Sequence, residues 1–96
     1  MSSKNLSDFN KNDFADCSDL KLGIVCSDWN SDITNNLYDG AYSVLIELGV
    51  QKENIICFRV PGSFELVYAA KKMSKMNVDA IICLGCIIKG ETNHFD

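Results

Sequence analysis

The chain has 96 residues, of which 47% are hydrophobic and 23% charged, proportions that are ordinary for one globular domain. Its formal net charge of −4 argues against a nucleic-acid partner, because proteins that bind phosphate backbones gather Lys and Arg on one face. No stretch approaches the ~20 consecutive apolar residues that a membrane-spanning helix needs. We therefore expect neither a nucleic acid nor a membrane as a partner.

Five cysteines bear on the compartment and on metal binding. Cys26, Cys57 and Cys83 lie inside apolar runs, where a free cysteine acts as a small hydrophobe. An odd number of cysteines in a chain without an apolar signal segment fits the reducing cytoplasm. Cys83 and Cys86 are spaced as in some metal sites, but residues three apart on a strand point to opposite faces. We therefore expect a cytoplasmic protein with buried strand cysteines and no metal site.

The first half of the chain predicts a leader, a strand and a helix. Residues 1–20 are polar with little periodicity, and we expect them to precede a domain over 21–96. The apolar run 21–26 predicts a buried strand. Apolar residues at helical spacing over 31–48 predict a helix, which Gly49 ends where a left-handed residue is favoured.

The second half predicts strand, helix and strand, over 54–60, 64–76 and 78–86. Alternating strands and helices with short connections predict a parallel sheet with right-handed crossovers, and we expect the strand order 2-1-3. Three strands and two helices alone would leave apolar faces and a sheet edge uncovered. We therefore expect the domain to be incomplete at its C-terminal end.

The unusual residues of the chain follow directly after the predicted strands. Residues 28–30 follow the first strand, 61–65 the second and 89–94 the third. In open α/β sheets, ligands bind outside the carboxyl ends of the strands, where the strand order switches. With the order 2-1-3, all three loops line one rim of the sheet, and we expect the binding site there.

The first two loops offer groups for an organic ligand. Trp29, the only tryptophan, can stack on a flat heteroaromatic ring, or it can cover the first helix as a hydrophobic plug. Ser63 and the N–H groups at the start of the second helix can hold a polyol or an anion. Glu65 lies in the first helical turn, where the helix dipole favours an acid whatever its other role.

The third loop suits a phosphate and a proton transfer. Lys89, Gly90 and Thr92 offer a cation, a glycine turn and a hydroxyl, although their spacing is not that of a nucleotide P-loop. Glu91 fits beside a phosphate only if its backbone N–H faces the anion. His94, the only histidine, can carry protons near neutral pH; an exposed loop histidine without a function is the alternative.

Together, the segments 23–30, 60–65 and 84–96 resemble the lumazine synthases, and the likeness runs from about residue 22 to 96. The resemblance implies a flavodoxin-like α/β/α sandwich that assembles into a homo-oligomer, either a pentamer or a shell of pentamers. It also implies the condensation of 5-amino-6-ribitylaminouracil with 3,4-dihydroxy-2-butanone 4-phosphate to 6,7-dimethyl-8-ribityllumazine. Phosphate and water are released, and neither a metal nor an organic cofactor is expected.

The resemblance further implies a role for each residue of the rim. Those expected to contact the pyrimidine and its ribityl chain are Trp29, Asn30, Ser63, Phe64, Glu65, Cys86, Ile87 and Ile88. Those expected at the phosphate are Gly90, Glu91 and Thr92. His94 is expected to transfer protons during Schiff-base formation, phosphate elimination and ring closure.

Two other interpretations compete with this one. A non-catalytic oligomerising fragment or shell module of the same fold would have no reason to keep His94 beside Gly-Glu-Thr. A generic flavodoxin-like domain that binds a flavin would carry a phosphate loop after the first strand, where an acid and a bulky ring stand instead. Lumazine synthases hold further site residues in strands and helices beyond the resembling part, so these 96 residues alone are expected to be inactive.

Overall fold

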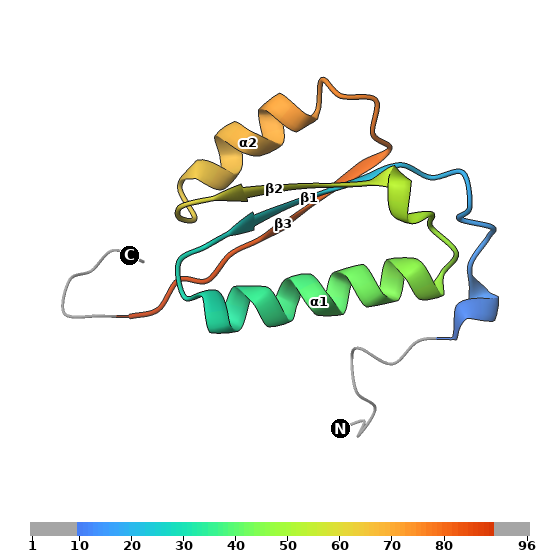
Figure 1. The fold of residues 1–96 in the computed structure, drawn as a ribbon, viewed down its shortest axis with the longest axis horizontal. Coiled ribbons are helices and arrows are strands. Elements are labelled where there is room, and N and C mark those ends of the chain that lie inside the picture. The colour runs from blue at the N-terminus through green and yellow to red at the C-terminus, as the bar shows by residue number, and fades with distance from the viewer. Residues whose placement is uncertain (1–9, 90–96) are drawn as a thin grey trace.

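The computed structural model describes residues 10–89. Its regular elements are a 3-10 helix (Lys11–Asp13), β1 (Leu22–Ser27), α1 (Ser31–Glu47), a second 3-10 helix (Lys52–Asn54), β2 (Ile55–Val60), α2 (Glu65–Met73) and β3 (Ala80–Leu84). The strands form one parallel sheet in the order β2-β1-β3, and α1 and α2 cover opposite faces of it (Figure 1). This arrangement confirms the predicted flavodoxin-like α/β fold and its strand order.

The central strand β1 is buried along its whole length. It pairs with β2 from Leu22 opposite Ile55 onward, and with β3 from Leu22 opposite Ala80 onward. A parallel strand that is covered on both faces needs apolar residues at successive positions. That requirement explains why the sequence of β1 shows a continuous apolar run rather than an alternating one.

The side chains of β1 alternate between two separate cores. Leu22 and Ile24 pack with Leu45 beneath α1. Val25 packs with Met73 beneath α2, and Met73 is fully buried. The sheet is thus the middle layer of three.

The face that α1 presents to the sheet differs from the predicted apolar stripe. Thr34 and Leu45 are buried and Tyr38 packs against the core, whereas Ile33 and Leu37 are 48% and 42% exposed. Ile33 and Leu37 each precede a sheet-facing residue by one position, and one residue turns an α-helix by about 100°. They therefore lie at the side of α1, outside the contact with β1.

Two of the three strand cysteines are not buried. Cys26 is buried in β1, but Cys57 and Cys83 are exposed, so the prediction of buried strand cysteines is wrong for both. They belong to β2 and β3, which have a neighbouring strand on one side only among the described residues. Cys83 lines a hollow beside α2, while Cys86 contacts Asn30 at the start of α1. Because β3 ends at Leu84, Cys86 lies beyond the strand, and the opposite orientation of the two thiols stays a prediction.

The ends of the elements differ slightly from the predicted ends. β3 ends at Leu84 rather than at residue 86, and α2 ends at Met73 rather than near 76. The N–H groups of Lys75 and Met76 bond to carbonyls three residues back, so the helix tightens into 3-10 geometry and stops. Gly49 has φ 99°, which confirms the left-handed end of α1. Neither helix in the described part of the chain is long and apolar enough to cross a bilayer.

The contact between β1 and α2 can be tested at Gly23, where a methyl group would fall on the thioether of Met73. Gly23→Ala should lower the free energy of unfolding by about 1–3 kcal/mol, because the buried Met73 must move. Gly40→Ala is the matched control, since nothing lies within 4 Å of the added methyl. It should raise stability by about 0.5–1 kcal/mol, because alanine restricts the unfolded chain. Urea denaturation measures both; equal changes would contradict this packing.

Candidate functional site

The loops after β1 and β2 are joined through their backbones at the carboxyl end of the sheet. The N–H of Asp28 donates to the carbonyl of Val60 at 2.7 Å, and the N–H of Trp29 donates to that of Pro61 at 3.0 Å. These bonds extend the pairing of the two strands beyond their regular ends. All three strands point toward the same end of the molecule (Figure 1), so their loops form one rim.

The segment after β3 is tied to the same rim through Cys86. The Ser63 hydroxyl lies 3.4 Å from the Cys86 carbonyl oxygen, and the Asn30 side-chain amide nitrogen lies 3.8 Å from the Cys86 sulfur. Both distances belong to weak hydrogen bonds. Contacts from the other two loops therefore converge on Cys86.

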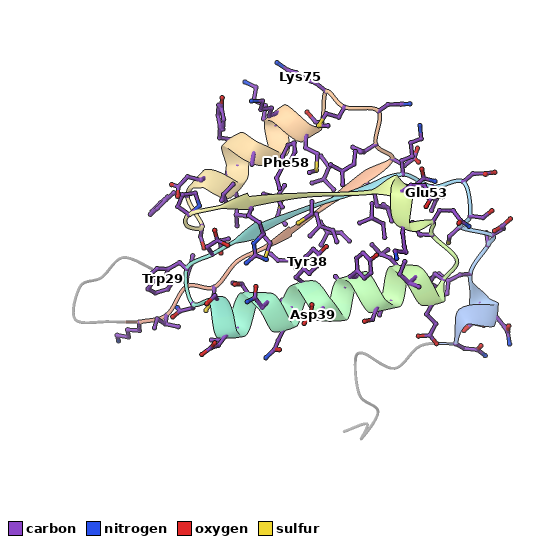
Figure 2. The ribbon with its side chains drawn as sticks, viewed as in Figure 1. Trp29, Tyr38, Asp39, Glu53, Phe58 and Lys75 are labelled. Atoms are coloured by element: carbon purple, nitrogen blue, oxygen red, sulfur yellow. The ribbon has the colours of Figure 1, made fainter. Side chains whose placement is uncertain are left out.

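Trp29 stands at the tip of the first loop and remains 50% exposed (Figure 2). The residue after it, Asn30, has φ 56° and ψ 55°, a left-handed conformation that Asn adopts more readily than most residues. The Asn30 carbonyl accepts the N–H groups of Ile33 and Thr34 at 2.9 and 3.1 Å. This sharp turn starts α1 directly after Trp29, which stays half exposed.

At the start of α2, the side chain of Glu65 accepts a hydrogen bond from the backbone just before the helix. The Gly62 N–H donates to Oε1 of Glu65 at 2.8 Å, and the Glu65 N–H donates to the Gly62 carbonyl at 3.2 Å. These two bonds close a tight turn directly before α2, and they hold the carboxylate where the helix dipole favours an acid. Phe64, which directly precedes Glu65, is 84% exposed. The backbone N–H of Gly62 is thus already paired with an anion of the chain itself.

A buried hydroxyl lies beneath the third loop. Ser27 is fully buried, and its Oγ has no hydrogen-bond partner among residues 10–89. Gly85 passes above it: a Cβ at this position would lie 3.6 Å from Ser27 Oγ, 2.9 Å from Ser63 Oγ and 2.8 Å from a methyl of Leu66. Only glycine allows the backbone to approach so closely. Gly85 therefore lets the third loop close onto the first two.

An apolar hollow of about 670 Å³ adjoins the rim on the α2 side of the sheet. Its lining consists of Ser63, Leu66, Val67, Ala70, Cys83, Gly85 and Ile87. Ser63 and Gly85 belong to both the hollow and the rim. The hollow thus begins where the loops meet and continues between α2 and β3.

The structure brings together four of the residues predicted for the substrate: Trp29, Asn30, Ser63 and Cys86. It places others at the surface beside them, with Phe64, Ile87 and Ile88 exposed and Glu65 turned toward Gly62. The predicted phosphate and proton-transfer residues lie outside the described residues: Gly90, Glu91, Thr92 and His94.

One side chain of the rim was not predicted from the sequence. Arg59 donates from Nε to Asp28 and from a terminal nitrogen to Asn35, each at 2.8 Å. The hydrogen bond to Asp28 raises the pKa of the Arg59 guanidinium above its usual value. A signal was present, because an arginine at the end of an apolar strand can bond a carboxylate on the neighbouring strand with its planar guanidinium. The carboxylate of Asp28, at the end of the preceding strand, was the nearest candidate.

Comparison with known proteins gives a match over most of the chain. A family model described as 6,7-dimethyl-8-ribityllumazine synthase matches residues 19–96. The 6,7-dimethyl-8-ribityllumazine synthase of Flavobacterium johnsoniae is 53% identical over 94 residues, which cover 97% of this chain and 50% of that protein. The protein of the same name from Christiangramia forsetii is 51% identical over 94 residues, covering 96% of this chain and 56% of that protein.

A third relative, from Parabacteroides distasonis and also named 6,7-dimethyl-8-ribityllumazine synthase, is 46% identical over 94 residues. They cover 97% of this chain and 59% of that protein. The chain thus spans about half the length of the curated relatives it matches. Because the family match takes in all three strands, both helices and the rim between them, the chain belongs to the 6,7-dimethyl-8-ribityllumazine synthase family.

Proposed function

We propose that the protein makes 6,7-dimethyl-8-ribityllumazine in riboflavin biosynthesis, by condensing 5-amino-6-ribitylaminouracil with 3,4-dihydroxy-2-butanone 4-phosphate. The observation that supports this most is the rim, where three loops are hydrogen-bonded to one another around a half-exposed indole. Membership of the family favours this function over a non-catalytic oligomerising fragment or shell module, since the relatives carry the name of the synthase.

The pyrimidine is proposed to stack on Trp29, which is half exposed. Asn30 and the backbone from Cys86 through Ile88 would lie along the edge of the pyrimidine. The ribityl chain is proposed to run past Phe64 and Glu65 toward Ser63. The Ser63 hydroxyl makes a long bond of 3.4 Å, which a ribityl hydroxyl can replace at little cost because long hydrogen bonds are weak.

The phosphate is proposed to bind at Gly90, Glu91 and Thr92, and His94 to transfer protons. In the sequence this stretch begins four residues after Cys86, the residue that contacts the other two loops of the rim. The amine of the pyrimidine attacks the ketone carbonyl and a first water leaves. Phosphate is then eliminated, and the second amine closes the ring on the remaining carbonyl with loss of a second water. Each step moves a proton, which an imidazole can carry at neutral pH. Holding both substrates in one rim supplies much of the rate.

We further propose that residues 21–96 form one domain preceded by a leader over 1–20, and that copies assemble in the cytoplasm as a pentamer or a shell of pentamers. The support for assembly is an apolar surface on α2, where Val67 and Tyr68 are 76% and 71% exposed. Contiguous exposed apolar surface is typical of protein interfaces. The support for the cytoplasm is that all five cysteines are free.

His94 provides the first test of this function. In the intact protein, His94→Ala should lower kcat by about 10²-fold or more, because the imidazole would carry protons in the reaction. Binding of the ribityl-pyrimidine should change little, since the ring and ribityl contacts remain. Lumazine absorbance gives the rate and a titration gives the affinity. An unchanged kcat would exclude His94 from the chemistry.

Trp29 provides the second test. Its fluorescence should change when 6,7-dimethyl-8-ribityllumazine is added, and Trp29→Ala should weaken binding by about 1–3 kcal/mol, the range for stacking of a base on an aromatic ring. Trp29→Phe keeps a stacking surface, so it should retain most of the affinity, and it also gives the background fluorescence. If saturating ligand leaves the indole emission unchanged, Trp29 covers α1 rather than binding the ring.

A further inference from the structure

Arg59 connects three elements at the α1 side of the sheet. It belongs to β2, opposite Cys26 of β1. Its Nε donates to Oδ1 of Asp28, directly after β1, and its terminal Nη2 donates to Oδ1 of Asn35 in α1, both at 2.8 Å. Nη2 also lies 2.8 Å from the same carboxylate oxygen of Asp28. Because a guanidinium is a rigid planar fork, these bonds fix where Asp28 and Asn35 lie relative to each other.

The segment that Arg59 spans contains Trp29. On one side of the indole, Asp28 is bound through its side chain to Arg59 and through its N–H to Val60. On the other side, Asn30 begins α1, whose residue Asn35 is bound to the same guanidinium. Trp29 thus lies between two points held by one side chain.

The ion pair between Arg59 and Asp28 contributes little to the stability of the fold. The side chains of Arg59 and Asp28 are 35% and 57% exposed, and ion pairs with such exposure contribute little to folding because water screens them. The fold depends instead on the two buried clusters on either side of β1. The pair is, however, adjacent to the one aromatic side chain of the rim that points to solvent from the β1 loop.

We propose that Arg59 is a positioning residue, which holds Asp28 and the start of α1 so that the Trp29 indole is preset to stack on the substrate ring. The stacking role rests on the proposed function; the restraint on the indole does not. Binding a ring to a mobile indole would first have to immobilise that side chain. Restraining it beforehand removes this cost, which for one side chain corresponds to about a 3- to 10-fold change in affinity.

Arg59→Met in the intact protein tests the restraint directly. The steady-state anisotropy of Trp29 fluorescence without ligand, corrected with a Trp29→Phe background, should fall because the indole gains motion. The dissociation constant for 6,7-dimethyl-8-ribityllumazine and the KM for the pyrimidine should rise by about 3- to 10-fold, while kcat changes less than about 2-fold. The midpoint of urea unfolding should move only slightly.

Lys75→Met is the matched control. It also replaces one positive charge with an apolar side chain, but Lys75 lies beyond the C-terminal end of α2 and away from Trp29 (Figure 2). Anisotropy, affinity and KM should all stay at their original values. A rise of KM in this variant as large as in Arg59→Met would assign the effect to net charge and overturn the proposal.

Two further variants separate the effect of the planar guanidinium from the effect of its positive charge. Arg59→Lys keeps the positive charge and a long aliphatic side chain, but it cannot bond both Asp28 and Asn35 in a fixed plane. It should therefore also lower the anisotropy and raise KM. Asp28→Asn combined with Arg59→Met should be no worse than the more damaging single change, because both remove the same restraint. Full wild-type values in Arg59→Lys would overturn the proposal.

The outcomes distinguish this inference from the proposed function. If the unaltered protein forms no lumazine but Arg59→Met still frees the indole, the function fails and the restraint by Arg59 stands. If the unaltered protein forms lumazine while Arg59→Met leaves anisotropy and KM unchanged, the function stands and Arg59 positions nothing. A loss of kcat with unchanged KM and anisotropy would likewise overturn the positioning role.

Discussion

β1 makes contact with every other regular element of the sandwich. β2 and β3 hydrogen-bond its two edges, and α1 and α2 cover its two faces through separate buried clusters. Burying both faces requires apolar residues throughout, so β1 can lie only in the centre. Because it is central, the loop that follows it is flanked on both sides by the loops of its neighbours. The loop after β1 contacts Pro61 on one side and Cys86 on the other, as a consequence of where β1 is buried.

The topology was predictable from the sequence because it depends on the period of apolar residues, which the sequence states directly. The sequence predicted less well which residues of each element are buried. Ile33 and Leu37 fit a helical period yet lie at the side of α1, since periodicity gives a stripe but not which edge of it meets the sheet. Cys57 and Cys83 were expected to be buried because their strands are apolar, although strands at the edge of the sheet are less covered than β1.

The rim was predictable in position but not in its bonding. Parallel strands in the order β2-β1-β3 bring three loops together whatever their residues are. Arg59 bonds Asp28 and Asn35, which lie 31 and 24 positions before it in the chain. No local sequence pattern could predict contacts over such separations. Glu65 shows the same limit: the helix dipole explains an acid at this position, but its bond to the Gly62 N–H depends on the side-chain conformation. His94 and the residues before it stay predictions, supported by the family to which the chain belongs.

Gly85 bears on how this rim tolerates change over evolutionary time. The backbone there runs so close to the side chains of Ser63 and Leu66 that a single added carbon atom would force either those side chains or the third loop to move. Either movement would change the spacing between the second and third loops at Ser63. A substitution at position 85 would therefore change the distance between the loops of the rim through the volume of its side chain. Gly85 is thus constrained by its size, whereas the other rim residues are constrained by the groups that they present.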